Sequence, residues 1–245
     1  KRQFTVRIET VFEDSPIPLR HWCYAFWAAC ASKKGVSALQ IKRMTGLSYK
    51  SALFMMHRIR FAMSGKPKER LKGVVEADET YVGGKPRNRG IASRGKVGRG
   101  TSKAPVIAVL ERGGDVRPKH VERPDGPTLK SFITQNVDLN SVLMTDELNL
   151  YVNLGRPFKR HGTVKHSNRE YVRGDAHVNS LESFFAIVKR SLYGTHHAVS
   201  RKHLHRYLGE RGFVFNSRNL DDGARTALAI KRAEGKRLTY TEYLQ

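Results

Sequence analysis

Two aspartates follow short apolar runs that have the composition of buried strands. Asp78 comes after VVEA, and Asp146 comes after VLMT. A carboxylate at the edge of a hydrophobic sheet is costly unless a cationic side chain or a metal ion offsets its charge. If the two strands are neighbours, the aspartates can share a hard cation such as Mg²⁺, which prefers carboxylate and water oxygens. The pattern therefore predicts a metal site between these strands.

A third ligand is available on the segment HVNSLESFFAIVKRSLYG. Its apolar residues recur at helical spacing and predict one packed face. These residues are Leu181, Phe184, Phe185, Val188 and Leu192. Glu182 lies off this stripe, with Asn179 one turn before it and Lys189 two turns after it on the same side. The same pattern is typical of an ordinary solvated helix face, but the two strand-end aspartates favour a site.

Two carboxylates on adjacent strands and one on a helix suit phosphoryl transfer by two metal ions held about 4 Å apart. Mg²⁺ or Mn²⁺ would activate the attacking water or 3′-hydroxyl and stabilise the leaving oxygen. In this interpretation Asp78, Asp146 and Glu182 hold the metals, and Lys189 holds a backbone phosphate of the substrate. Glu76 shares a strand face with Asp78, so it either approaches the metals or supports the site structurally.

The charge of the chain indicates an anionic partner. The 245 residues include 45 lysines and arginines against 22 aspartates and glutamates, a formal charge of +23. Such self-repulsion opposes compaction unless a polyanion offsets it, and nucleic acid is the commonest one. No apolar run reaches the roughly 18 residues that cross a bilayer, and no secretory signal is present. We therefore expect a cytoplasmic protein whose partner is nucleic acid and not a membrane.

Helical spacing predicts three helices near the N-terminus, at residues 19–31, 38–44 and 49–63. Ser37 and Ser48 are suited to cap the second and third, and a glycine makes the turn between them. Two short helices joined in this way form a helix-turn-helix.

The helix-turn-helix has two interpretations. In the first, its second helix enters a DNA major groove and presents Tyr49, Lys50, His57 and Arg58. In the second, it is a small helical subdomain with no role in binding. The overall charge favours the DNA interpretation.

After a polar linker the periodicity changes from helical to alternating. The predicted strands cover residues 73–82, 104–112, 115–123, 141–146 and 163–167, with a Gly-Gly hairpin between the second and third. The predicted helices cover residues 127–137, 147–154, 178–193 and 200–217. Three strands in a meander followed by alternating elements predict an α/β domain with a mixed sheet. This is the element order of the ribonuclease-H-like fold.

A glycine-rich basic loop at residues 83–103 separates the first two strands. It carries seven cations and no acid, so it cannot bury a core of its own. The cations are Lys85, Arg87, Arg89, Arg94, Lys96, Arg99 and Lys103. A solvated flexible loop is the simpler interpretation, but this charge favours an arm that tracks DNA phosphates. His177, just before the predicted acid-bearing helix, is a further candidate DNA contact.

The blocks GVVEADETYVGGK, TDELNLY and HVNSLESFFAIVKRSLYG, with the sequence that follows them to FNSRN, resemble bacterial DDE-type insertion-sequence transposases of the ISXO-like group, insertion-sequence family fifteen ninety-five. This group is related to eukaryotic Merlin elements. The resemblance implies a ribonuclease-H-like domain that cleaves transposon ends and joins them to target DNA. Asp78 and Asp146 match the first two catalytic acids. The third is Glu182 or Asn179, and Glu182 is preferred because it adds charge to the metals. A homodimer or a higher synaptic assembly in the nucleoid is also implied.

The resemblance also implies a domain order. Members of the group usually begin with a zinc ribbon, so residues 1–18 are expected to be the remnant of that module in an N-terminally truncated chain. The helix-turn-helix region then covers 19–66, the catalytic domain 70–220 and a C-terminal tail 221–245. Two other functions share parts of the pattern. One is a catalytically inactive helix-turn-helix DNA-binding protein, and the other is a metal-dependent ribonuclease-H-like nuclease without strand transfer.

Overall fold

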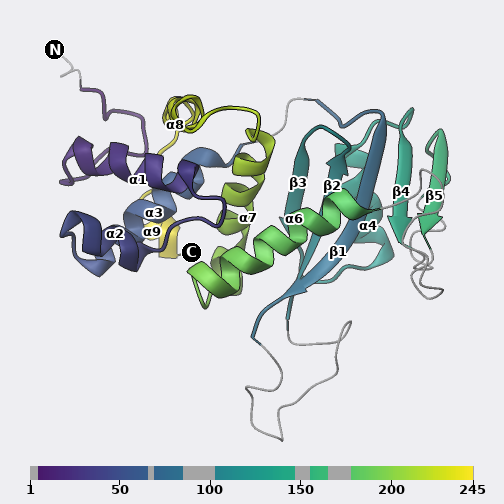
Figure 1. Ribbon diagram of the computed structural model, residues 1–245, viewed down its shortest axis with the longest axis horizontal. Helices are drawn as coiled ribbons and strands as arrows, with labels where there is room; N and C mark the ends of the chain where they lie inside the picture. The colour runs from purple at the N-terminus through teal and green to yellow at the C-terminus, as the bar shows by residue number, and fades with distance from the viewer. Residues whose placement is uncertain (1–4, 66–68, 85–102, 147–154, 165–177, 245) are drawn as a thin grey trace, which may run out of the picture. The chain divides into compact units, whose positions relative to one another are not determined.

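The computed structural model describes residues 5–65, 69–84, 103–146, 155–164 and 178–244. The chain forms two compact units, which we call the helical unit and the sheet unit (Figure 1). The helical unit comprises Lys1–Lys66, Arg190–His197 and Arg206–Gln245, and the sheet unit comprises Pro67–Lys189 and Ala198–His205. The chain therefore builds the sheet unit as an insertion and then returns to the helical unit. The expected boundaries, with a catalytic domain over 70–220 and a tail over 221–245, differ from these units, because residues 206–245 pack with the N-terminal helices.

The elements of the helical unit come from both ends of the chain. They are α1 (Leu19–Ala31), α2 (Ala38–Thr45), α3 (Tyr49–Met63), the π-helical turn η4 (Ser191–Thr195), α8 (Asp222–Lys231), α9 (Tyr240–Leu244) and most of α7 (Arg201–Asn216). Their core buries Trp22 and Phe26 of α1 together with Met56 of α3, Phe213 of α7 and Ala229 of α8. No helix within the described residues has the length and apolar character that a membrane span requires.

Helices form where the sequence predicted the two short helices of the helix-turn-helix. The Ser37 side chain accepts a hydrogen bond from the Gln40 backbone N–H at the start of α2, and Ser48 does the same for Ser51 at the start of α3. Gly46 closes α2 with a φ of 72°, a left-handed conformation in which a β-carbon is unfavourable.

The weak alternation of KRQFTVRIETVF, residues 1–12, predicts one or two short strands, but none forms within the described residues. Residues 6–9 and 11–14 form turns instead, and Thr10 makes an isolated bridge to Glu234. Val11 is fully buried in the core of the helical unit. The alternating pattern therefore does not mark a strand in the described residues. It places one apolar side chain, Val11, in the core from within a series of turns.

The sheet unit contains one five-stranded sheet in the order β3-β2-β1-β4-β5. Its strands are β1 (Val74–Val82), β2 (Ala104–Glu111), β3 (Val116–His120), β4 (Val142–Asp146) and β5 (Arg160–Val164), and its helices are α4 (Gly126–Asn136) and α6 (Asn179–Arg190, of which Arg190 falls in the helical unit). The first three strands are antiparallel neighbours, while β4 and β5 run parallel to β1. This mixed sheet is the ribonuclease-H-like fold that the element order predicted. The helix predicted over 147–154 lies outside the described residues.

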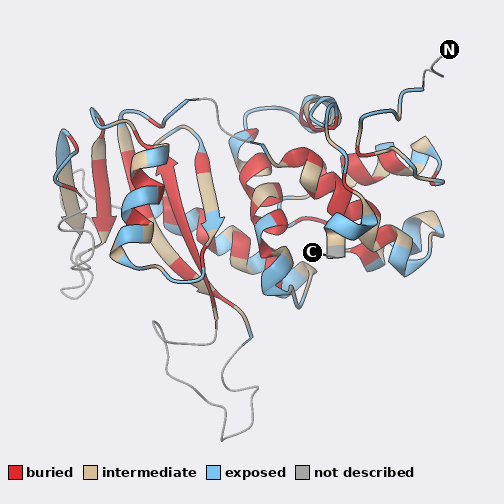
Figure 2. Ribbon diagram, turned by 180° about the vertical axis from the view of Figure 1, so that it is seen from behind, coloured by how far each residue is buried: buried red, intermediate tan, exposed pale blue. Residues whose placement is uncertain are grey.

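The two faces of the sheet carry different side chains. Val75, Ala77 and Leu143 pack in one buried cluster with Phe132 and Ile133 of α4. Because side chains alternate between the faces of a strand, the residues between them point the other way. Helix α6 lies on that second face, and Figure 1 shows it in front of the sheet with α4 behind. Figure 2 shows the buried positions along the central strands from the α4 side.

A buried ionic network holds the helical unit together. Both oxygens of Glu210 are paired, with Arg60 Nε at 2.8 Å and with Arg211 Nη2 at 2.7 Å, and all three side chains are almost fully buried. The Arg60 guanidinium also lies 4.0 Å from the centre of the Tyr207 ring. Burial alone would raise the pKa of Glu210, but the charges of Arg211 and Arg60 lower it to about 2. The network thus ties α3 to α7 across a long separation in sequence.

Replacing Glu210 with glutamine should destabilise the helical unit, because two buried guanidinium groups lose their counter-charge. We expect Glu210→Gln to lower the free energy of unfolding by about 3–5 kcal/mol at pH 7 in urea titrations. The wild-type contribution should be present above pH 4.5, the ordinary pKa, and be lost as the pH falls toward 2. Asp14→Asn, which breaks an exposed pair with Arg237, should cost less than about 1 kcal/mol. Equal losses in the two variants would contradict the network's role.

Candidate active site

The parallel pairing of β1 with β4 brings Asp78 and Asp146 together, although Asp78 lies in the middle of β1 and not at its end, because β1 continues to Val82 in its pairing with β2. Ala77 is the register partner of Thr145, so Asp78 and Asp146 are the next residues along the two strands. Neighbouring strands lie about 4.8 Å apart, and both aspartates follow residues of the α4 face. They therefore point to the opposite face, which α6 covers. The sequence predicted that Asp78 and Asp146 come together if their strands are neighbours. The strand order meets that condition.

Helix α6 brings Glu182 to the same edge of the sheet. The backbone N–H of Leu181 donates to Glu76 Oε2 at 2.9 Å, which fixes the first turn of α6 against β1. Glu182 is the next residue of the helix, and its carboxylate interacts electrostatically with Asp78. Asn179 is exposed in the same turn. Lys189 lies two turns further along and is half-buried, about 10 Å from Glu182 along the helix axis.

Negative charge accumulates around Asp78. Burial raises its pKa, and the carboxylates of Glu79, Asp146 and Glu182 raise it further, to about 8. One interaction opposes the shift, since Asp78 Oδ1 accepts the backbone N–H of Glu79 at 2.7 Å. The strongest charges that act on Asp78 are thus carboxylates, in a chain whose net charge is strongly positive. Such a site is suited to receive a cation.

The donors at this edge fit a hard divalent ion, because Asp78, Asp146 and Glu182 offer only carboxylate oxygens. Their spacing is wider than that of a closed ligand set. Across the ranges that the structure describes, no three carboxylate, imidazole or thiolate side chains are arranged to hold one ion together. The segments 147–154 and 165–177, which follow β4 and β5, lie outside those ranges.

The predicted DNA contacts on α3 divide into two groups. Tyr49 and Lys50 are exposed in its first turn, as that prediction requires. Arg58 is not: its side chain is 4% exposed, and its guanidinium donates to the carbonyl oxygens of Leu238 at 3.0 Å and Glu13 at 2.6 Å. His57 is also buried, against Tyr243 of α9. The prediction that Arg58 and His57 contact DNA is therefore wrong, because the C-terminal segment covers this part of α3.

The remaining predicted contacts lie mostly outside the described residues. This is the case for His177 and for six cations of the basic loop, namely Lys85, Arg87, Arg89, Arg94, Lys96 and Arg99. Lys103 is described. It lies half-buried just before β2, and its side chain approaches Gly83 at the end of β1.

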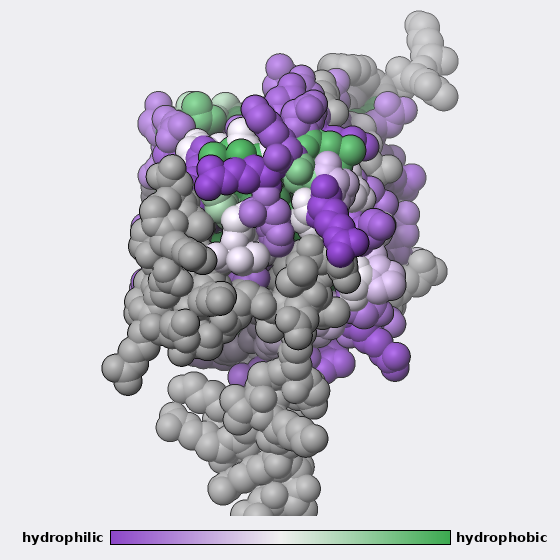
Figure 3. All heavy atoms as spheres, turned by 90° about the vertical axis from the view of Figure 1, so that its right-hand side faces the viewer, coloured by the Kyte–Doolittle hydropathy of each residue, from purple (hydrophilic) through white to green (hydrophobic). Residues whose placement is uncertain are grey.

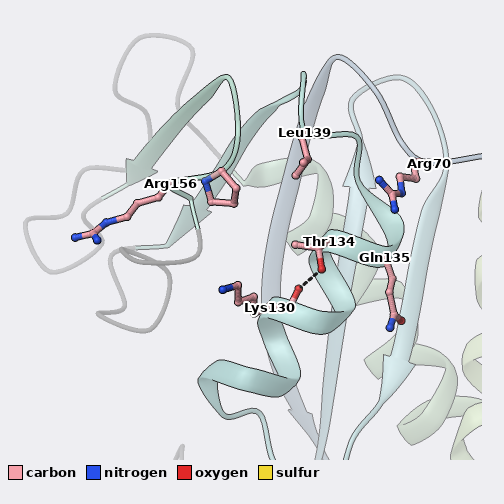
Figure 4. A pocket seen from close by; sticks show the side chains of 7 residues that line it. Arg70, Lys130, Thr134, Gln135, Leu139 and Arg156 are labelled. Carbon is pink, nitrogen blue, oxygen red and sulfur yellow. Dashed lines mark hydrogen bonds between the residues drawn. The ribbon is translucent and has the colours of Figure 1, made fainter.

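A basic groove on the α4 side of the sheet unit was not predicted. It has a volume of about 750 Å³, and none of the residues that line it is acidic (Figure 4). Those residues are Arg70, Lys130, Thr134, Gln135, Leu139, Arg156 and Pro157. Figure 4 shows Arg70 and Arg156 on opposite sides of Lys130, and Figure 3 shows hydrophilic side chains around a smaller apolar area on the β5 side. The groove lies near the start of β4, whereas Asp146 ends that strand, so it is separate from the acids.

Arg112 was also missed. It follows β2 directly, and its Nε donates to Glu76 Oε1 at 2.8 Å. The predicted meander of three strands could have indicated it, because in the antiparallel pair of β1 and β2 the Arg112 backbone N–H donates to the carbonyl of Val74, two residues before Glu76. The groove residues offered no such signal, since they are distant in sequence and share no motif.

The ribonuclease-H-like sheet thus carries acids on β1 and at the end of β4, and a further acid lies in the first turn of α6. Residues 70–216 match the ISXO2-like transposase domain. The chain is also 30% identical over 221 residues to a protein of Halobacterium salinarum described as an uncharacterized protein in transposable element ISH50, covering 84% of this chain and 73% of that protein. The chain belongs to the ISXO2-like transposase family.

The raised pKa of Asp78 has a measurable effect on stability. In the metal-free protein the folded chain keeps this proton up to about pH 8, whereas the unfolded chain loses it near pH 3.8. Stability linked to Asp78 is therefore fully present below pH 3.8 and is lost as the pH rises toward 8. We expect Asp78→Asn to raise Tm above that of the wild type at pH 9 in EDTA, with a smaller difference at pH 5. Asp115→Asn, at an exposed hairpin turn, is the control. A Tm difference independent of pH would contradict this prediction.

Proposed function

We propose that this chain is a DNA transposase that cleaves transposon ends and joins them to target DNA with the help of divalent metal ions. Membership of the transposase family supports the general role. The observation that carries the finer proposal is the gathering of Asp78, Asp146 and Glu182 at one edge of the sheet, where burial and the charges of neighbouring carboxylates raise the pKa of Asp78. Carboxylates gathered in this way are suited to metal-dependent phosphoryl transfer.

Transposases of the DDE class generally use divalent ions, and the oxygen donors here suit Mg²⁺ or Mn²⁺. Asp78, Asp146 and Glu182 would hold the ions. When bound, the metal lowers the pKa of the attacking water or 3′-hydroxyl and stabilises the leaving oxygen. Asp78 and Asp146 would place the ions on the sheet, and α6 covers that face of the sheet. Lys189 extends the site along α6 and would hold a phosphate of the DNA backbone.

DNA recognition falls to other parts of the chain in this proposal. The first turn of α3, with Tyr49 and Lys50 exposed, would meet the DNA, since recognition helices contact base edges through their N-terminal residues. Lys50 also lies 5.2 Å from the centre of the Tyr240 ring, which supports its side chain. The basic loop at 83–103 would add phosphate contacts. A synaptic assembly of two or more copies would hold both transposon ends.

Asp78→Asn and Asp146→Asn should each abolish strand cleavage while DNA binding stays intact, because each removes a metal-holding carboxylate without changing the basic surface. Cleavage is measured on labelled DNA that carries transposon ends, and binding is measured by fluorescence anisotropy at the same salt concentration. Glu182→Gln and Asn179→Ala, tested in parallel, identify the third ligand. Loss of activity in Asn179→Ala alone would assign that role to Asn179.

The same assay separates the alternative functions when pre-cleaved ends are supplied. Joined products support a transposase, and nicking without joining supports a nuclease. Binding alone, with no cleavage by the wild type at any Mg²⁺ or Mn²⁺ concentration, supports a catalytically inactive DNA-binding protein. Full cleavage by either aspartate variant would remove that carboxylate from the proposed site.

DNA affinity should depend steeply on salt. If the chain neutralises about 6–10 phosphates, counterion release weakens binding by about 10³–10⁵ between 50 and 200 mM salt. Isothermal titrations at a series of salt concentrations measure this slope. Replacing the seven cations of the loop with glutamine should reduce the slope, whereas glutamine at the exposed α2 residues Lys42 and Arg43 should change it less. A flat dependence for the wild type would contradict a binding mode based on phosphate contacts.

A further inference from the structure

Glu76 is a fully buried carboxylate whose two oxygens are both engaged. It lies on β1 two residues before Asp78 and therefore on the same face of the sheet. Its Oε1 accepts the Nε–H of Arg112 at 2.8 Å, and its Oε2 accepts the backbone N–H of Leu181 at 2.9 Å. Glu76 thus connects a β2–β3 hairpin residue to the first turn of α6.

The contact with Leu181 supplies an N-terminal cap for α6, which the residue directly before the helix does not provide. The first backbone N–H groups of a helix have no partner within the helix and normally need a capping side chain. Val178, directly before α6, has no polar side-chain atom, although its carbonyl accepts the N–H of Glu182 at 3.0 Å. The carboxylate of Glu76 takes the place of a local cap. Its negative charge also suits the positive end of the helix dipole.

This cap lies between two of the acids in the proposed site. Glu76 is two residues from Asp78 on β1, and Leu181 is the residue before Glu182 on α6. This hydrogen bond therefore restrains α6 from sliding or rotating relative to β1, together with the buried apolar face of the helix. A shift of one residue along α6 would move Glu182 by about 1.5 Å and turn it by about 100°. Glu182 would then no longer point toward Asp78.

Arg112 allows a carboxylate to serve as this cap. An unpaired buried carboxylate beside Asp78 would be expensive and would add to the repulsion in the site. The Arg112 side chain is 21% exposed, and its backbone N–H is held by the Val74 carbonyl at 2.9 Å, so the guanidinium is presented from a fixed point of the sheet. The charge of Glu76 is therefore balanced by Arg112.

We propose that Glu76, held by Arg112, is a positioning residue that sets the register of α6 against β1 and thereby places Glu182 for metal binding. This inference rests on the proposed function, because it assumes that Asp78, Asp146 and Glu182 share metal ions. Glu76 itself does not touch the substrate or the metal. Its effect is exerted through the first turn of α6.

The test compares Mn²⁺ binding, followed by electron paramagnetic resonance, in the wild type, Glu76→Gln, Glu111→Gln and Asp78→Asn. Glu111→Gln is the matched control, since Glu111 also accepts a backbone N–H, that of Lys72 at 3.0 Å, but does not contact α6. Residues that orient metal ligands typically change metal affinity by about 10–100-fold when replaced. We expect Glu76→Gln to weaken Mn²⁺ binding by about that factor, with DNA affinity unchanged, and cleavage to recover in part at high Mn²⁺. Glu111→Gln should bind Mn²⁺ like the wild type.

Each outcome has one meaning. If Asp78→Asn removes Mn²⁺ binding but a folded Glu76→Gln binds like the wild type, the positioning role is overturned and the proposed function stands. If Asp78→Asn binds Mn²⁺ like the wild type, the proposed metal site fails. If Glu76→Gln does not fold, as judged by circular dichroism, Arg112→Lys decides, because it keeps the charge and loses the directed Nε–H. Weaker Mn²⁺ binding by a folded Arg112→Lys supports the positioning role, and unchanged binding overturns it.

Discussion

The burial of Asp78 beside other carboxylates is the constraint on which the proposed site depends. Asp78, Asp146 and Glu182 come from three separate elements, and burial, together with the charges of Glu79, Asp146 and Glu182, raises the pKa of Asp78 to about 8. The parallel pairing of β1 with β4 and the hydrogen bond from Leu181 to Glu76 hold these elements in place. In the proposed function divalent cations would balance the carboxylates.

Three buried or half-buried carboxylates show how the surroundings decide the role of an acid. Glu210 lies between two guanidinium groups that lower its pKa to about 2, and it serves as a structural link. Glu76 has one guanidinium and one helix N-terminus, and it connects β1 to α6. Asp78 faces mainly other carboxylates. Within the described residues, the strongest charges on Asp78 are carboxylates, and this distinguishes its surroundings from those of Glu210 and Glu76.

Much of the fold could be predicted from local pattern. The serine caps, the glycine turn of the helix-turn-helix, the Gly-Gly hairpin and the apolar strands all form close to where the sequence indicated. These features depend on a few neighbouring residues, so local chemistry is sufficient. The errors have a common cause. Arg58 was expected to contact DNA, and residues 1–12 to form strands, because neither pattern reveals that the distant C-terminal segment packs against them.

The sequence by itself determined which side chains are available: two aspartates after apolar runs, and an amphipathic helix with Asn179, Glu182 and Lys189 on one side. It also determined the element order, because strand and helix periodicity are properties of adjacent residues. Only the tertiary structure decided that β1 and β4 are neighbours, that Arg112 balances Glu76, and that residues 206–245 return to the helical unit. Those outcomes depend on strand pairing and buried contacts between distant residues, whose energies do not appear in any short stretch of the chain.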